Sequence, residues 1–302
     1  MNQLKGLVYA VISSSTFGLI PFFALPVLGA GVGLNSLMFY RFAISSLVLG
    51  VYLLLRRQEL KVNVRELAAL SGLGMLYALT ALFLTHSYLY IPSGVATTIH
   101  FLYPVVVTVV MIAFFKEKVS TGVVLAALLA VLGVYLLGNG CGEGAVSLKG
   151  LALVLITVLT YALYIVGVNK SSVSAMDGLK MTFYVLFACT VVFGLNLLLR
   201  GERLDLPPTA YIWGYLILLA LIPTLISDFT LILAVQHVGS TTTAILGCME
   251  PLTAVGMGVL FLGEYFSGVQ LLGMLVVLSA VFIVILSARK RAEEKPVRTG
   301  ES

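Results

Sequence analysis

Charged side chains are scarce in this sequence, where 18 Lys and Arg and 13 Asp and Glu make up 10% of 302 residues. An average soluble domain has about 25%. Apolar residues reach 60%, and a soluble protein could not confine so many to one core because its surface must carry charged groups. The composition therefore excludes a soluble protein and predicts a surface that faces lipid. Ten spans of about 20 residues each would leave room only for short loops.

Residues typical of metal and nucleotide sites are also few. The three Cys and three His lie far apart, without the CxxC or HxxxH spacing of a zinc site or disulfide framework. The absence of a GxxxxGK[ST] motif excludes an ATP-driven pump acting by itself. The net charge of +5 comes from scattered basic residues, which form no face for nucleic acid. We expect no metal, no cofactor and no nucleic-acid partner.

Ten apolar runs bounded by Gly, Pro or charge predict an all-α integral membrane protein with ten transmembrane helices. The third and fourth runs nearly merge, and Pro92 marks the break between them. The runs lie at residues 4–26, 34–55, 66–90, 92–115, 119–138, 148–168, 178–199, 210–235, 239–262 and 267–288.

The distribution of basic residues indicates the orientation. Fourteen of the 18 Lys and Arg fall on one side of the predicted helices, three fall on the other, and Arg41 lies inside a helix. The side richer in Lys and Arg is the cytoplasmic one. Both termini, including the basic tail at 289–302, are therefore expected in the cytoplasm.

An internal repeat divides the chain into two halves. Lys5-Gly6-Leu7 recurs as Lys149-Gly150-Leu151, which also argues that the first run is a helix and not a cleaved signal peptide. Because each half has five helices, an odd number, the second enters the membrane from the opposite side. We expect inverted repeats at 4–138 and 148–288. Six further residues recur at an offset of 147: Ser93, Pro104, Phe114, Glu117, Ser120 and Leu128 match Ser240, Pro251, Phe261, Glu264, Ser267 and Leu275.

These repeated stretches resemble the EamA repeat of the drug/metabolite transporter superfamily. The resemblance lies in Tyr103-Pro104 through FFKEKVSTG (114–122) to LGVYLL (132–137), in Glu250-Pro251 through FLGEYFSGVQLLG (261–273), and in Tyr40-Arg41-Phe42. It implies a ten-helix carrier with a central cavity between the halves and peripheral fifth and tenth helices.

The function that the resemblance implies is secondary transport, with no enzymatic activity. The expected substrate is a small metabolite such as an amino acid or drug-like compound, exported by alternating access, and a coupling proton is a further candidate partner. A bacterial-type plasma membrane is the expected location, since no long N-terminal transit segment is present. The alternatives are a membrane channel and an integral-membrane enzyme acting on lipid. The oligomeric state stays open.

Three charged residues fall inside the predicted helices, where each costs at least about 2.5 to 3.5 kcal/mol on insertion scales. Glu250, near the midplane, could bind a cationic group or carry a proton, or cap a helix at the break made by Pro251. Arg41 could bind a substrate carboxylate or phosphate, or lock helices by capping carbonyls or pairing with an acid. Asp228 could act at a gate, or snorkel to the interface.

By the same offset of 147, His100 and Tyr103 are the counterparts of Gly247 and Glu250. Both symmetry-related helices should therefore present these faces to one cavity. His100 could transfer a proton near neutral pH, or donate a single hydrogen bond to a carbonyl.

The remaining candidates are aromatic or structural. Tyrosines at helical spacing could line a pocket or simply pack, and Tyr77, Tyr161 and Tyr164 are the candidates of this kind. Four residues are assigned structural roles: Pro104, Pro251, Glu117 and Glu264. Each proline removes a backbone donor and should free the carbonyl one turn earlier, at His100 or Gly247.

The predicted topology can be tested on Cys141, which falls in the loop GNGCGEG. This loop lies outside the cell, whereas Cys189 and Cys248 fall inside helices. A membrane-impermeant thiol reagent on intact cells should therefore label Cys141 alone. Labelling that appears only after lysis would contradict the orientation.

Overall fold

The computed structural model describes residues 2–115, 147–247 and 249–293, together with 125, 128–129, 132–133 and 135–137. Glu117, Cys141 and Cys248 lie outside these residues. The described part of the chain is helical throughout, as the apolar composition predicts, because a helix satisfies its own backbone groups in lipid. The first half forms α1 (Asn2–Phe17), α2 (Ile20–Gly29), α3 (Leu34–Leu55), α4 (Val64–Ser87), α5 (Ser93–His100) and α6 (Tyr103–Phe115). The second forms α8 (Leu148–Lys170), α9 (Gly178–Arg200), α10 (Ala210–Ala220), the π-helix η1 (Leu221–Ile226), α11 (Ser227–Leu246), α12 (Met249–Phe261) and α13 (Gly268–Glu293).

Seven helical stretches within the described residues are long and apolar enough to cross a membrane. Two shorter apolar helices, Met249–Phe261 and Gly268–Ala280, accompany them. This composition is that of an integral membrane protein. The predicted fifth span, 119–138, lies mostly outside the described residues, so the count of ten stays a prediction. The seven stretches are Leu4–Gly29, Leu34–Leu55, Val64–Ser87, Ser93–Val110, Leu148–Lys170, Gly178–Arg200 and Ala210–Gly239.

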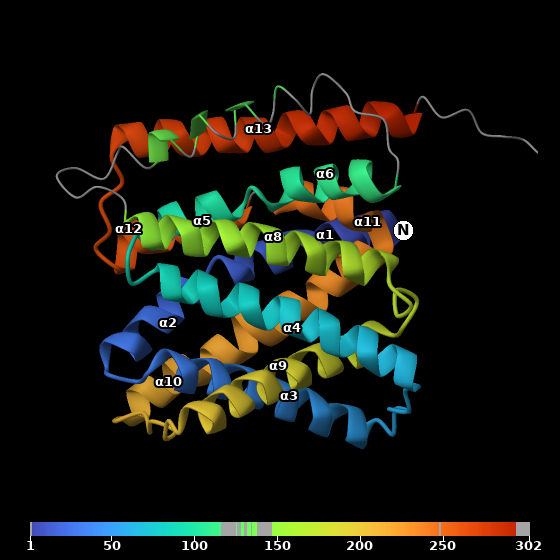
Figure 1. The fold of residues 1–302 in the computed structure, drawn as a ribbon, viewed down its shortest axis with the longest axis vertical. Coiled ribbons are helices and arrows are strands. Elements are labelled where there is room, and N and C mark those ends of the chain that lie inside the picture. The colour runs from blue at the N-terminus through green and yellow to red at the C-terminus, as the bar shows by residue number, and fades with distance from the viewer. Residues whose placement is uncertain are drawn as a thin grey trace, which may run out of the picture.

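The helices run across the molecule in broadly the same direction, from α13 at one edge to α3, α9 and α10 at the other (Figure 1). Helices from the first part of the chain pack against helices from the second: α1 against α11, α3 against α9, α4 against α8 and α9, and α5 against α12. The two parts therefore share one interior, and a site in that interior receives side chains from both.

Three predicted spans are interrupted where a single helix was expected. The first breaks at Gly18 and Leu19, the fourth at Phe101 and Leu102, and the ninth before Met249. Each break is followed within a few residues by a proline, at positions 21, 104 and 251. Proline is tolerated in the first turn of a helix but not in its interior, so the chain starts a new helix at each one.

The break before Pro251 also corrects one prediction, that this proline leaves the Gly247 carbonyl free. The Glu250 N–H donates to the Gly247 carbonyl at 2.9 Å, so that carbonyl has a partner. Glu250 itself stands in the first turn of α12, directly after the break.

The eighth and ninth predicted spans join into one run of helix from Ala210 to Leu246. At the predicted boundary between them the helix has a kink at Gly239, whose φ of +79° favours glycine. A second irregularity, the π-helix η1, had no signal in the apolar pattern.

Glu264 connects the two halves at one end of the molecule. Its carboxylate accepts from the N–H groups of Ser93 and Gly94, at 2.8 and 3.2 Å, and so caps α5. Gly263, with φ of +68°, turns the chain after α12 so that the Glu264 N–H reaches the Gly258 carbonyl at 3.0 Å. Glu264 thus has a structural contact, whereas its repeat partner Glu117 lies outside the described residues.

Two glycines of α4 provide a matched test of helix packing. A Cβ atom on Gly74 would lie 2.4 Å from the Cβ of Ala188 and 3.0 Å from the Val185 carbonyl, whereas one on Gly72 would meet nothing within 4 Å. We expect Gly74→Ala to destabilise the protein by about 1–3 kcal/mol through overpacking against α9. Gly72→Ala should leave stability unchanged or raise it by up to about 1 kcal/mol. Thermal unfolding of the purified variants in detergent measures both, and equal midpoints would contradict this close contact.

Candidate substrate and coupling site

The structure gathers the predicted binding and coupling residues into one buried set. They were expected to line a cavity, but none has more than 3% of its surface exposed, so in this structure they pack against one another. They come from seven helices in both halves: Arg41 (α3), Tyr77 (α4), His100 (α5), Tyr103 (α6), Tyr161 and Tyr164 (α8), Asp228 (α11) and Glu250 (α12).

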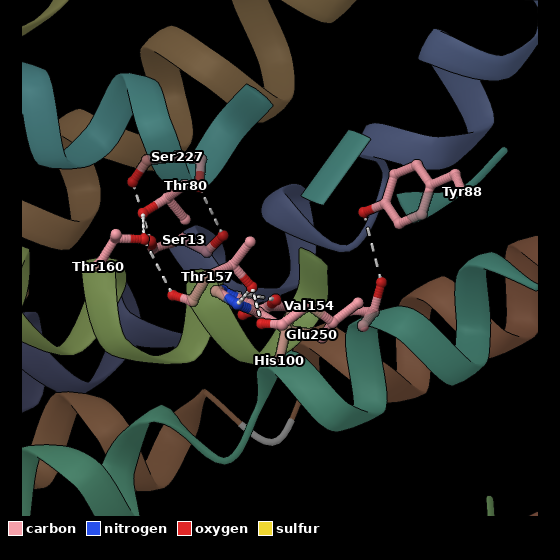
Figure 2. Close-up of polar contacts among 10 residues, drawn as sticks. Ser13, Thr80, Tyr88, His100, Val154, Thr157, Thr160, Ser227 and Glu250 are labelled. Atoms are coloured by element: carbon pink, nitrogen blue, oxygen red, sulfur yellow. Dashed lines mark hydrogen bonds and ion pairs between the residues drawn. The ribbon is translucent and has the colours of Figure 1, made fainter. Parts of the chain in front are cut away.

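His100 and Glu250 face each other at one end of this set (Figure 2). The Thr157 hydroxyl donates to the Val154 carbonyl at 2.7 Å and lies 2.8 Å from His100 Nδ1. Since its one proton is used, that hydroxyl accepts from Nδ1–H. The expected partner of His100, a backbone carbonyl, is therefore wrong, and the partner is a hydroxyl.

This arrangement leaves two buried atoms without hydrogen bonds. His100 Nε2 lies 3.9 Å from Glu250 Oε1, and neither atom has a hydrogen-bond partner among the residues that the structure describes. In the neutral ring with its proton on Nδ1, Nε2 is an acceptor, so an acceptor faces a carboxylate oxygen. Buried polar groups without partners are costly, and one proton placed on either group would relieve the conflict.

Arg41 and Asp228 lie at the other end of the set. Arg41 Nε donates to Thr224 Oγ1 at 2.6 Å, and the Thr224 hydroxyl donates to the Leu219 carbonyl at 2.8 Å across the π-helix. Asp228 Oδ1 accepts from the Tyr164 hydroxyl at 2.6 Å. The snorkelling interpretation of Asp228 is wrong, because the side chain is buried and points to Tyr164. Arg41 joins α3 to η1, though through a hydroxyl and not through the carbonyls or the acid that we expected.

A series of aromatic rings links the two ends. Tyr77 stacks on Tyr164 with ring centres 5.1 Å apart, and Tyr164 lies 6.1 Å from Tyr161. Tyr161 in turn lies 5.0 Å from the His100 ring and 4.7 Å from Tyr103. In this structure the tyrosines pack against one another, which is one of the two roles that the sequence analysis considered for them. Through them α8 contacts both charged ends.

The sequence analysis did not predict the hydroxyl contacts between helices. Ser13 and Ser227 each donate to the other's carbonyl at 2.9 Å, which joins α1 to α11. Thr80 and Thr160 lie 2.7 Å apart between α4 and α8, and Figure 2 shows both contacts. The run Ser13-Ser14-Ser15-Thr16 inside an apolar span was the signal that could have revealed the first.

A cavity of about 850 Å³ lies outside this buried set, at the end of the molecule where α3 begins and α9 ends. Polar side chains line it, among them Asn35, Asn196 and the exposed Arg200, and buried apolar residues such as Ala78 and Phe193 form another part of its wall. Phe193 stacks on Phe42, with ring centres 5.6 Å apart and planes inclined by 2°. Phe42 follows Arg41 in the chain, so this part of the cavity wall approaches the Arg41 end of the set.

Apolar helices of membrane-spanning length around a buried charged site define an integral membrane protein that keeps polar groups in its interior. The chain belongs to the EamA-like transporter family, which it matches over residues 4–139 and 148–286. It is therefore a membrane transporter, as the resemblance in its repeats implied.

Two individual proteins are similar to this chain. The uncharacterized transporter YdfC of Bacillus subtilis (strain 168) is 23% identical over 260 residues, which is 85% of this chain and 83% of that protein. A protein of known crystal structure has a TM-score of 0.67 and 17% identity, covering 96% of this chain and 97% of its own. At this identity the structure supports the fold alone.

The hydrogen bond between Tyr164 and Asp228 predicts a stability difference between two tyrosines. Tyr164→Phe removes the only hydrogen-bond donor that the described residues offer to the Asp228 carboxylate, and should cost about 1.5–3 kcal/mol. Tyr77→Phe removes a buried hydroxyl whose contact with Arg41 falls short of hydrogen-bond geometry and which has no hydrogen bond among the described residues, so its effect should stay within about 0.5 kcal/mol. Thermal unfolding in detergent compares them, and a larger loss for Tyr77→Phe would refute this assignment.

Proposed function

We propose that this protein is a secondary transporter that exports a small polar or amphipathic metabolite, coupled to a proton. The proposal includes ten helices in two inverted repeats, at 4–138 and 148–288, with both termini in the cytoplasm of a bacterial-type cell. The eight buried residues form the substrate and coupling site, and alternating access exposes them to each side of the membrane in turn.

The observation that carries this proposal is the pair formed by His100 and Glu250. His100 comes from the first half and Glu250 from the second. Their facing atoms are both buried, and neither has a hydrogen bond to any described residue. A proton held between them would favour contact of the two halves at this point. Its loss would leave a carboxylate facing an acceptor nitrogen and favour separation. Proton binding and relative movement of the halves would thereby be linked.

The contacts between the halves suit such a movement. Ser13 with Ser227, and Thr80 with Thr160, join helices by hydroxyl groups, and hydrogen bonds between membrane helices contribute on average only about 0.6 kcal/mol. Each hydroxyl can also bond to its own helix, as Thr80 does to the Leu76 carbonyl at 2.8 Å. The halves can therefore separate without leaving these groups unsatisfied.

Glu250→Gln tests the proposal, because the amide keeps the shape of the side chain and removes its charge. The variant should fold and reach the membrane, but lose the response of transport to a pH gradient in proteoliposomes. Continued exchange of substrate without that response indicates a coupling role, and loss of substrate binding indicates direct recognition. Saturable flux with counterflow is expected of a carrier and not of a channel.

The matched control is Glu66→Gln, at the start of α4. Glu66 completes a capping box with Asn63, and glutamine serves that position equally well. This variant should transport as the wild type does. Wild-type flux and wild-type pH response in Glu250→Gln would refute the coupling proposal. The substrate is to be found first by thermal-shift screening of metabolites on the purified protein, and the direction of flux by comparing vesicles of both orientations.

A further inference from the structure

Among the described residues, Arg41 is the largest fully buried side chain. Its Nε donates to Thr224, but within the described part of the chain Nη1 and Nη2 have no partner with hydrogen-bond geometry. These two nitrogens form the end of the guanidinium fork, the edge that binds two oxygen atoms side by side. Buried polar groups are nearly always satisfied, so this edge is prepared for a planar, two-oxygen acceptor.

Two neighbouring groups are also incompletely bonded. The Tyr77 hydroxyl lies beside the Arg41 guanidinium in a polar contact that falls short of full hydrogen-bond geometry, and it has no such bond to any other described group. Asp228 is near enough for the Arg41 charge to act on it, yet the two form no ion pair within 4.0 Å. The Oδ2 atom of Asp228 has no hydrogen-bond partner in the described part of the chain. Asp228 therefore balances the charge of Arg41 across a gap without occupying the fork.

We propose that Arg41 and Tyr77 form a subsite for a carboxylate group of the transported solute, and that this carboxylate displaces Asp228 as the counter-ion of Arg41. This inference rests on the transport function proposed above and names the chemical class that the site recognises. A carboxylate matches the fork in shape and in its single charge. A phosphate dianion would place two negative charges close to Asp228, which repels them.

The cavity of about 850 Å³ supplies the route to this subsite. Phe193 lines the cavity, Phe42 stacks on Phe193, and the Arg41 guanidinium carbon lies 5.2 Å from the centre of the Phe42 ring. Phe42 also meets Tyr77 edge to face at 5.8 Å. Rotation of the Phe42 and Phe193 rings opens the subsite to a solute in the cavity, and the tyrosine stack beyond it contacts the rest of the solute.

The test compares two probes of nearly the same shape, 3-phenylpropionate and 3-phenylpropionamide, the neutral amide in which an NH2 group replaces one carboxylate oxygen. Binding to the purified full-length protein is followed by the fluorescence of Trp213, the only tryptophan. Trp213 contacts Tyr40, the residue before Arg41, with ring centres 5.3 Å apart. We expect the carboxylate to bind at least about tenfold more tightly than the amide. Equal binding of the two probes would overturn the proposal.

Four variants separate this subsite from a structural role of the same residues. Arg41→Gln, and Arg41→Lys, which keeps the charge but loses the fork, should each weaken carboxylate binding about tenfold or more. Tyr77→Phe should weaken it a few fold. Asp228→Asn removes the competing charge and should tighten it several fold. A purely structural charge pair predicts no such gain, so unchanged or weaker binding by Asp228→Asn refutes the displacement.

Arg200→Gln is the control for charge in the cavity itself, because the exposed Arg200 lines it. It should keep the difference between the probes. Loss of that difference in Arg200→Gln, together with its persistence in Arg41→Lys, would place the carboxylate beside Arg200 and overturn the proposal. Because binding is measured without flux, a negative result here leaves the Glu250 transport test unaffected, and the converse also holds.

Discussion

Four buried ionisable side chains, Arg41, His100, Asp228 and Glu250, set the main constraint on this structure, because an uncompensated charge inside a bilayer is strongly unfavourable. Each of the two pairs is compensated only in part. Tyr164 satisfies one oxygen of Asp228, Thr224 satisfies one nitrogen of Arg41, and Thr157 satisfies one nitrogen of His100. His100 Nε2 is left facing Glu250 Oε1, and Arg41 and Asp228 keep polar atoms without hydrogen bonds to the described residues. Under the function proposed above, one further proton or ligand would complete this bonding.

Helix α8 contacts both ends of the site. It packs on α4 and presents Thr157, Tyr161 and Tyr164 in successive turns, so one side of one helix contacts both charged pairs. A displacement of α8 that accompanies ligand binding near Arg41 would therefore also be felt at His100 and Glu250. This shared helix is the physical basis on which recognition and proton coupling can be linked in a single movement.

The repeats are alike in backbone and different in chemistry. Both carry a helix break just before a proline, at Pro104 and Pro251, but Tyr103 stands at one break where Glu250 stands at the other. The interior is consequently asymmetric although the framework is repeated. The hydroxyl contacts are another example. Ser13 and Thr157 occupy matching positions at an offset of 144, and each contacts a group of the opposite half.

The membrane class and the identity of the buried charged residues could be predicted from the sequence alone, because composition, hydrophobic run length and the cost of intramembrane charge are local properties. The family followed from the motifs in the two repeats, and Pro92 predicted the helix break at that position. Which residues meet depends on the tertiary structure: Arg41 with Thr224, Tyr164 with Asp228, His100 with Glu250. The partners in these pairs lie 64 to 183 positions apart in the sequence. They come from helices whose relative orientation depends on the π-helix η1 and on the breaks at Phe101 and before Met249. A one-residue insertion such as a π-turn rotates every later side chain about the helix axis, and the hydrophobic pattern of the sequence does not reveal it.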